Sequence, residues 1–253
     1  MRGVVTPPAR PGPDLRGPDR TAPDLATAIR AVLAGAGDPV RAMGQQRYMK
    51  SAMPYRGLTS AQLKALLRPL LTSWVPGSRA EWEETVRDLW ERATHREEWY
   101  AALRVARHRR ARAWLDPDSL PLWRHLVVSG AWWDVVDETA THLVRDTLAG
   151  HSAEVTPAID AWAVDEDVWL RRTSVICQVG RRAETDRDLL LRAVEANLDD
   201  PSFWLRKGIG WGLRDYARTD PDWVWAQVDR LGERLSPLSR REATKHRGTV
   251  SLP

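Results

Sequence analysis

Trp133 and Asp137, in the stretch "SGAWWDVVD" at 129–137, have residue types and a spacing that could do chemistry. Residues four apart on a helix lie one turn apart on the same face, so an indole and a carboxylate would stand side by side. An aromatic face and a carboxylate both attract positive charge. A surface tryptophan beside a solvated aspartate is the alternative interpretation of the same spacing.

Arg172 is the second candidate, in "WLRRTSVIC" at 169–177. It falls three residues after Trp169 and four before Ile176, so a charged side chain interrupts an apolar helical stripe. Such an arginine either extends its guanidinium to water or faces an anion across a partly buried groove.

Trp211 is the third candidate, in "LRKGIGWGLRDYAR" at 205–218. The apolar stripe of this segment passes through Ile209, and Trp211 is rotated about 200° from it, so its indole is expected to face away from the core. Three glycines surround it, and each should cost about 1 kcal/mol relative to alanine in a helix interior. They predict that something approaches this backbone closely; the three are Gly208, Gly210 and Gly212.

A helix from about Trp132 to Leu148 is predicted to position the first pair, because apolar residues recur there at three- and four-residue steps. Trp132 belongs to that stripe and is expected in the core, and Trp133 at its margin. The other members of the stripe are Val135, Val136, Ala140, Leu143, Val144 and Leu148.

Nearly all of the chain from Asp24 onward is predicted to be helical, in roughly twelve helices of about 9 to 18 residues, with no alternating pattern typical of strands. Capping boxes are expected at Ser78 with Glu81 and at Thr94 with Glu97. A tryptophan recurs every 34 to 36 residues, which indicates one helical hairpin per repeat stacked into a solenoid, unless four helices share the residue by chance. These tryptophans are Trp99, Trp133, Trp169 and Trp204.

Composition limits the class of protein. The 253 residues contain one cysteine, Cys177, which excludes an internal disulfide and a Cys-rich zinc site. No apolar run approaches the roughly 18 to 20 residues of a membrane span. Residues 1–23 are rich in Pro, Gly and Arg and are predicted to be a disordered tail, and residues 24–253 to be a single domain. We expect a cytoplasmic protein.

The charge distribution points to a polyanionic partner. The net charge is +4, and only four of the 38 Lys and Arg residues are lysines. Arginine forms bidentate contacts with phosphate, although a GC-rich genome would also enrich it. Basic residues cluster in "RVARHRRAR" at 104–112 and in "RREATKHR" at 240–247.

These stretches together resemble the AlkD family of bacterial DNA glycosylases, over about residues 40–247. The resemblance rests on five segments in the same order: "RYMKSAMPYRG" (47–57), "SGAWWDVVD" (129–137), "VWLRRTSVICQ" (168–178), "FWLRKGIGWGLRDYARTDPDWV" (203–224) and "LSPLSRREATKH" (235–246). It implies an all-α fold, a right-handed superhelical solenoid of HEAT-like hairpin repeats with a concave DNA-binding face.

The resemblance also implies roles for individual residues. The catalytic tryptophan and aspartate fall on Trp133 and Asp137, and a second aromatic wall falls on Trp211. A phosphate-contacting arginine falls on Arg172, and a tyrosine near the damaged pair on Tyr48. Lys50, Lys207 and Arg214 complete the expected DNA contacts. Thr59 departs from the pattern, since some members carry a polar amide there.

The activity implied is hydrolysis of the N-glycosidic bond of cationic N3- or N7-alkylated purines in duplex DNA, by a monomer, without base flipping, metal or cofactor. This would place the protein at the nucleoid. A non-catalytic DNA-binding paralogue and a scaffold for acidic proteins are the alternatives. The resemblance further predicts that Arg172→Ala weakens DNA binding with little loss of stability.

Overall fold

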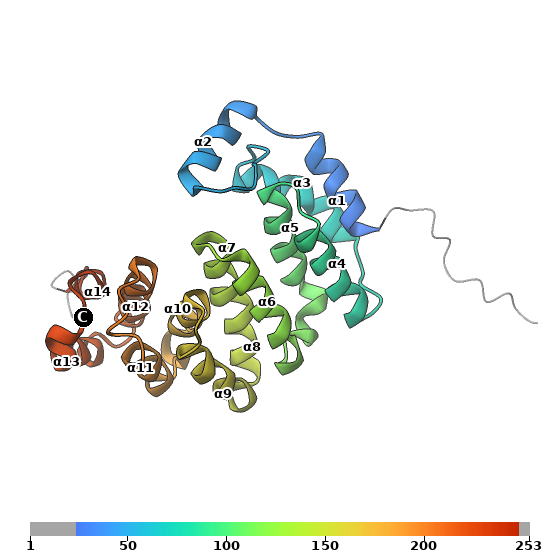
Figure 1. The fold of residues 1–253 in the computed structure, drawn as a ribbon. Helices are drawn as coiled ribbons and strands as arrows, with labels where there is room; N and C mark the ends of the chain where they lie inside the picture. Colours follow the sequence, from blue (N-terminus) through green and yellow to red (C-terminus); the bar gives the residue numbers. More distant parts are fainter. Residues whose placement is uncertain (1–23, 248–253) are drawn as a thin grey trace, which may run out of the picture.

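The computed structural model describes residues 24–247, which fold into an all-α solenoid without strands in this range. The proposed tail at 1–23 and the last residues of the proposed domain, 248–253, lie outside it. Figure 1 shows the chain curving from α1 to α14, with α2 opposite α7 and α12. The helices are α1 (Leu25–Ala34), α2 (Pro39–Met49), α3 (Ser60–Ser73), α4 (Arg79–Glu91), α5 (Arg96–Ala106), α6 (Leu120–Gly130), α7 (Trp133–Glu138), α8 (Arg145–Gly150), α9 (Ser152–Ala163), α10 (Val168–Ile176), α11 (Arg187–Glu195), α12 (Phe203–Tyr216), α13 (Pro221–Leu231) and α14 (Pro237–Ala243).

Two helices of the expected hairpin type make up each repeat. α4 packs on α5, α6 on α7 and α9 on α10, and α5, α7, α10, α12 and α14 then pack on one another in a row. α7 and α8 are parts of one helix, joined by a π-helical segment at Thr139–Val144. The expected number of helices was therefore close, although several are shorter than 9 residues.

The repeating tryptophans occupy equivalent places, as the 35-residue period predicted. Each lies in the first turn of a helix of the inner row: Trp99 in α5, Trp133 in α7, Trp169 in α10 and Trp204 in α12. The period therefore corresponds to the repeat of the solenoid.

Helix α10 joins two hydrophobic clusters that together form the core. Its first turns contribute Trp169 and Leu170 to the cluster that extends back to α1. Its last turn contributes Val175 and Ile176 to the cluster that extends to α14. Because both clusters share this helix, a change in its position moves both halves of the solenoid.

Neither expected capping box forms in full. Ser78 caps α4 by accepting from the Glu81 N–H, but the Glu81 carboxylate accepts from the Gly77 N–H and not from that of Ser78. Glu97 does not reach back to Thr94. Its carboxylate is buried and accepts backbone N–H groups from Arg56, Gly57 and Leu58. A buried carboxylate needs such donors, and the loop before α3 supplies them. The loop is thereby fixed against α5.

The glycines of α12 are explained by neighbouring helices rather than by a ligand. A Cβ at Gly208 would meet the Arg172 guanidinium at 3.0 Å, and one at Gly212 would meet the Val175 carbonyl oxygen at 3.0 Å, both on α10. A Cβ at Gly210 would meet the Ser239 carbonyl oxygen of α14 at 2.9 Å. The predicted close approach is confirmed, but the approaching groups are α10 and α14.

We expect Gly210→Ala to lower the free energy of unfolding by about 1–3 kcal/mol, because α14 must move to admit the methyl group. Gly44→Ala is the matched control: Gly44 lies in α2 with no atom within 4 Å of an added Cβ. That change should stabilise the protein by about 0.5–1 kcal/mol. Urea denaturation measures both, and equal stability of Gly210→Ala and wild type would refute the packing argument.

Candidate functional site

The turn before α7 places Trp133 at the first position of that helix. Gly130 ends α6 against Trp90 and Val135, where a side chain would not fit, and Ala131 takes a left-handed conformation. Trp132 is then extended and caps α7 without being part of it.

The expectation that Trp132 lies in the core is wrong. Its ring is half-buried and packs against Trp169 at 6.1 Å and Trp204 at 5.4 Å between centroids. The buried stripe begins at Val135, because the helical period does not extend to a residue that precedes the helix. The remaining members of that stripe are buried as expected.

Asp137 is bound by Arg172 through two parallel hydrogen bonds. Arg172 Nε lies 2.8 Å from Asp137 Oδ1 and Nη2 lies 2.8 Å from Oδ2. The third nitrogen of the guanidinium, Nη1, donates to the Trp204 carbonyl at 2.5 Å. This fork links α7, α10 and α12, and it leaves 18% of the carboxylate side chain exposed.

The Arg172 side chain therefore does not face phosphate. It is 5% exposed, and each of its three nitrogens donates a hydrogen bond inside the protein. Of the two alternatives, the arginine faces an anion, and that anion is Asp137. The expectation that Arg172 can be removed with little loss of stability is accordingly corrected.

Burial raises the pKa of the Asp137 carboxyl above its ordinary value of 3.8, whereas the hydrogen bonds and charge of Arg172 lower it. Without the guanidinium, burial would act unopposed and the carboxyl would hold a proton more readily. Arg172 thus favours the ionised carboxylate at neutral pH.

Trp211 lies beside this pair. Its ring is half-buried, and the Arg172 guanidinium carbon is 6.0 Å from its centroid. Trp133 is one helical turn from Asp137 on α7. Trp211 also packs against the hydrophobic cluster that extends to α14, so the expectation that its indole faces away from the core is wrong.

Lys207 and Arg214 are both paired with Glu242 of α14, at 2.8 and 2.5 Å. These two ion pairs join α12 to α14, and Glu242 partly neutralises the charge of both cations. The sequence marked these cations as DNA contacts but gave no indication of their shared carboxylate.

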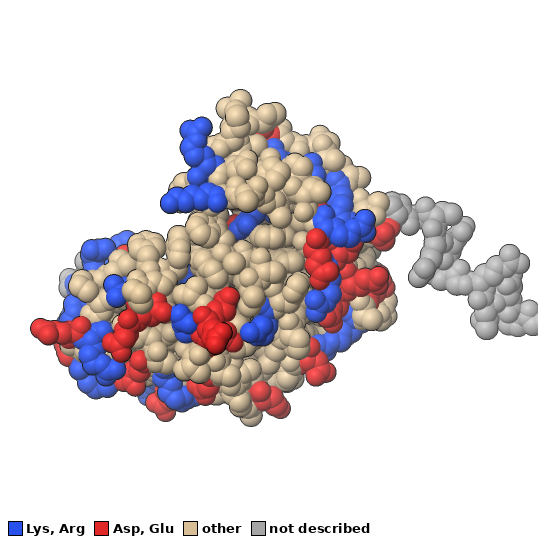
Figure 2. All heavy atoms as spheres, viewed as in Figure 1, with Lys and Arg blue, Asp and Glu red and all other residues tan. Residues whose placement is uncertain are grey.

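Tyr48 and Lys50 lie opposite α7, at the end of α2. Tyr48 is 76% exposed and Lys50 is exposed in a left-handed conformation. Figure 2 shows Lys and Arg side chains gathered over this part of the molecule. Both residues line a cavity of about 460 Å³ whose other walls are aromatic: Trp132, Trp133, Phe203 and Trp204.

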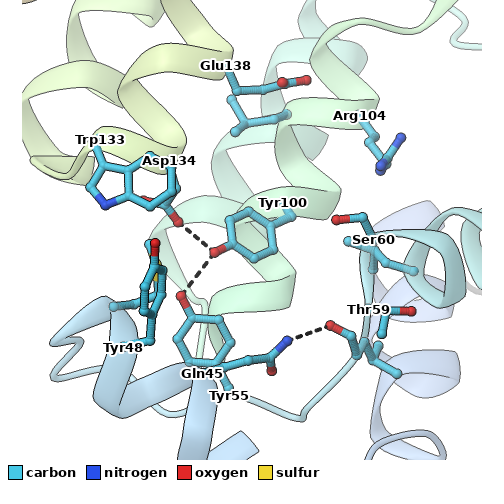
Figure 3. Close-up of a pocket in the computed structure, with 14 residues that line it drawn as sticks. Gln45, Tyr48, Tyr55, Thr59, Ser60, Tyr100, Arg104, Trp133, Asp134 and Glu138 are labelled. Atoms are coloured by element: carbon cyan, nitrogen blue, oxygen red, sulfur yellow. Dashed lines mark hydrogen bonds between the residues drawn. The ribbon is translucent and has the colours of Figure 1, made fainter. Parts of the chain in front are cut away.

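A second cavity, of about 360 Å³, lies on the other side of Tyr48 and Trp133, between them and α3 and α5 (Figure 3). Asp134 closes it: its carboxylate accepts from Tyr100 Oη at 2.5 Å and from Arg96 Nη2 at 2.6 Å. Tyr55 Oη is 3.0 Å from Tyr100 Oη.

Sequence reasoning missed this network. Asp134 follows Trp133 directly in the sequence. Its partner Arg96 precedes the repeat tryptophan Trp99 by three residues, whereas Arg172 follows the repeat tryptophan Trp169 by three residues. Burial, followed by the charge of Asp134, raises the pKa of Tyr100 far above its ordinary value, so the phenol stays protonated and donates.

No metal site accompanies these residues. Within 24–247, no group of three or more His, Cys, Asp or Glu side chains is arranged to hold an ion. The helices of the same range include none that is long and apolar enough to cross a membrane.

Comparisons with known proteins agree with the fold. Residues 29–246 match the family model described as DNA alkylation repair enzyme. A solved structure described as a predicted DNA alkylation repair enzyme from Enterococcus faecalis superposes with a TM-score of 0.75 at 27% identity, over 85% of this chain and 98% of that chain. A search of curated proteins returned no match.

We expect Arg172→Met to lower the free energy of unfolding at neutral pH by about 3–5 kcal/mol, because it leaves the Asp137 carboxylate buried and unpaired. The loss should shrink as the pH falls and Asp137 takes up a proton, since protonation removes the unpaired charge. Urea denaturation at several pH values measures both effects.

Arg192→Met is the matched control. Arg192 binds Asp160 with the same two-bond geometry, both at 3.0 Å, but its side chain is 49% exposed. Exposed pairs contribute at most about 1 kcal/mol. Equal, small losses of unfolding free energy in the two variants would show that burial does not increase the contribution of the Asp137 pair to stability.

Proposed function

Because the chain belongs to the DNA alkylation repair enzyme family, we propose that it is a DNA glycosylase acting on cationic N3- and N7-alkylated purines in duplex DNA. The role in DNA repair follows from the family. The glycosylase activity is supported by one observation above others: a partly exposed carboxylate, Asp137, is fixed by Arg172, with Trp133 one helical turn from Asp137 and Trp211 beside Arg172.

The reaction breaks the bond between C1′ of the deoxyribose and the purine nitrogen. The electron pair of that bond passes to the purine, which neutralises its positive charge and makes it a good leaving group. Positive charge then develops on the sugar, and water adds to C1′ and loses a proton. Asp137 stabilises the developing charge and orients the water.

The ion pair suits this task. A carboxylate offers about four lone-pair positions and Arg172 uses two, so the exposed part of Asp137 can still accept a hydrogen bond from water. Arg172 acts through Asp137: it holds the carboxylate in place and ionised, and it does not contact the substrate.

Trp133 and Trp211 add aromatic faces. Each can attract a cationic base or sugar with about 0.5–2 kcal/mol. Trp133 lines two cavities and Trp211 lines neither of them, so the two rings do not form the walls of one closed pocket, and this supports excision without flipping the base. Tyr48 and Lys50 would contact the duplex from the α2 side, and Lys207 and Arg214 from the α12 side.

We expect the protein to release 7-methylguanine from duplex DNA in single-turnover assays and to leave uracil untouched. Uracil is neutral and its N-glycosidic bond is stable, whereas the aromatic faces and the carboxylate attract positive charge. A bulky N7 adduct should be released about as well as the methyl one. Efficient release of uracil, or rejection of every adduct larger than methyl, would contradict the proposal.

Asp137→Asn should fold, bind duplex DNA and lose most base release, because it keeps the shape of the carboxylate and removes its charge. Removal of one comparable electrostatic group costs about 10²–10³ in rate in other enzymes. The wild-type rate should rise with pH through the raised pKa of Asp137, since only the ionised form acts, and the variant should lack this rise.

Asp88→Asn separates chemistry from the loss of an ion pair. Asp88 lies on α4 and is 24% exposed in a pair with Arg30, with Nη1 to Oδ2 at 2.6 Å. This variant should keep the wild-type rate at saturating protein. A rate for Asp137→Asn close to that of Asp88→Asn would exclude Asp137 as the catalytic carboxylate.

A further inference from the structure

A third cavity, of about 400 Å³, lies between α3 and the C-terminal end of α5. Its floor is apolar and its rim is basic. The basic side chains are Lys64 and Arg68 of α3, and Arg104, Arg107, His108 and Arg109. We call it the basic cavity.

Most of this positive charge is not neutralised. Arg107 pairs with Glu138. Over residues 24–247, no carboxylate forms an ion pair with Lys64, Arg68, Arg104 or Arg109. The cations of α12 differ, since Lys207 and Arg214 share Glu242.

The arrangement opposes the stability of the free protein. Lys64 and Arg68 lie four residues apart on one face of α3, where like charges repel by about 0.2–0.5 kcal/mol. Arg104 faces them from α5 across the cavity. Such a concentration of unpaired positive charge is typical of a site that binds a polyanion.

The neighbouring histidine adds shape rather than charge. His108 is buried, its Nε2 lies 2.9 Å from the Leu71 carbonyl oxygen, and burial lowers its pKa. The ring joins the end of α5 to α3, and this contact fixes the two basic walls relative to each other. The cavity is therefore present before any ligand binds.

The basic cavity adjoins the cavity beside Trp133, and Arg104 lines both. Tyr100 contacts Asp134 next to Trp133, and Arg107 follows it by seven residues on α5. A rise of 1.5 Å per residue makes this about 10 Å. Successive nucleotides of one strand advance by about 3.4 Å, so the separation corresponds to about three nucleotides.

We propose that the basic cavity binds phosphodiester groups of the DNA about two to four nucleotides from the lesion. The proposal rests on the proposed function for its substrate, duplex DNA. It assigns to Lys64, Arg68, Arg104 and Arg109 the phosphate contacts that Arg172 does not make. These residues hold the duplex and take no part in bond cleavage.

The double variant Lys64→Gln/Arg68→Gln tests the proposal, since both side chains are exposed and the fold does not need them. Affinity for undamaged and for 7-methylguanine duplexes is measured over a salt series. Two lost contacts should weaken binding and reduce the slope of log affinity against log salt by about 1.8. The rate constant of base release at saturating protein should stay at the wild-type value.

Arg218→Gln/Arg234→Gln is the control with the same charge change. Both residues are exposed and lie beyond α12 and α13, away from the basic cavity. Unchanged affinity and slope in the Lys64/Arg68 variant, or an equal loss in the control, would overturn the proposal. Binding is measured without catalysis, so an absence of base release would count against the glycosylase and not against the basic cavity.

Neutral methylphosphonate linkages locate the contact. Placed one at a time on either side of the lesion, they should weaken binding to the wild type at about two to four nucleotides and have little effect there on the double variant. Inorganic phosphate, compared with chloride at equal ionic strength, should not displace the DNA. Displacement by phosphate alone would indicate a site for a small free anion and overturn the assignment to DNA.

Discussion

The buried pair of Asp137 and Arg172 is the interaction on which the site depends. Burial raises the pKa of this carboxyl, and a guanidinium fixed 2.8 Å from each of its oxygens opposes that rise and favours the ionised form. The same guanidinium binds the Trp204 carbonyl, so the position of α12 relative to α7 is set by the group that sets the charge. The same arginine therefore influences the charge of the carboxyl group and fixes the helices around it. An arginine buried this deeply is retained only where its anion is as well placed as this one.

Helix α7 is held in the same manner on both sides. Asp137 binds Arg172 of α10, and Asp134 binds Arg96 of α5 at 2.6 Å. Because these carboxylates are three residues apart, the first two turns of α7 are fixed to both neighbours, and Trp133 at its start has little freedom to move. The π-helical segment that follows at Thr139–Val144 widens the helix directly after this clamp. Segments of this kind recur at functional sites, since they change which residues face a groove.

Local patterns were sufficient to predict the helices and the tryptophan repeat, since each depends on residues within one or two turns. They failed where the partner is distant. Arg172 and its carboxylate are separated by 35 residues, and the sequence shows an interrupted apolar stripe but not what the arginine meets. Glu97 has the spacing of a capping box, yet three loop amides compete for it successfully. Trp132 was misplaced because periodicity cannot show where a helix begins.

In the glycine-rich helix α12, close packing against neighbouring helices and pairing of charges occur together. Without side chains at Gly208 and Gly210, α12 approaches both α10 and α14 closely, and Glu242 then reaches the cations that α12 carries. Close packing of α12 is therefore accompanied by partial neutralisation of two of its cations, Lys207 and Arg214. Around the basic cavity, by contrast, Lys64, Arg68, Arg104 and Arg109 form no ion pair with a carboxylate of the described residues. Under the proposed function, holding a polyanion and stabilising a cation make opposite electrostatic demands, and a curved solenoid would meet both by placing the basic cavity and Asp137 on different repeats.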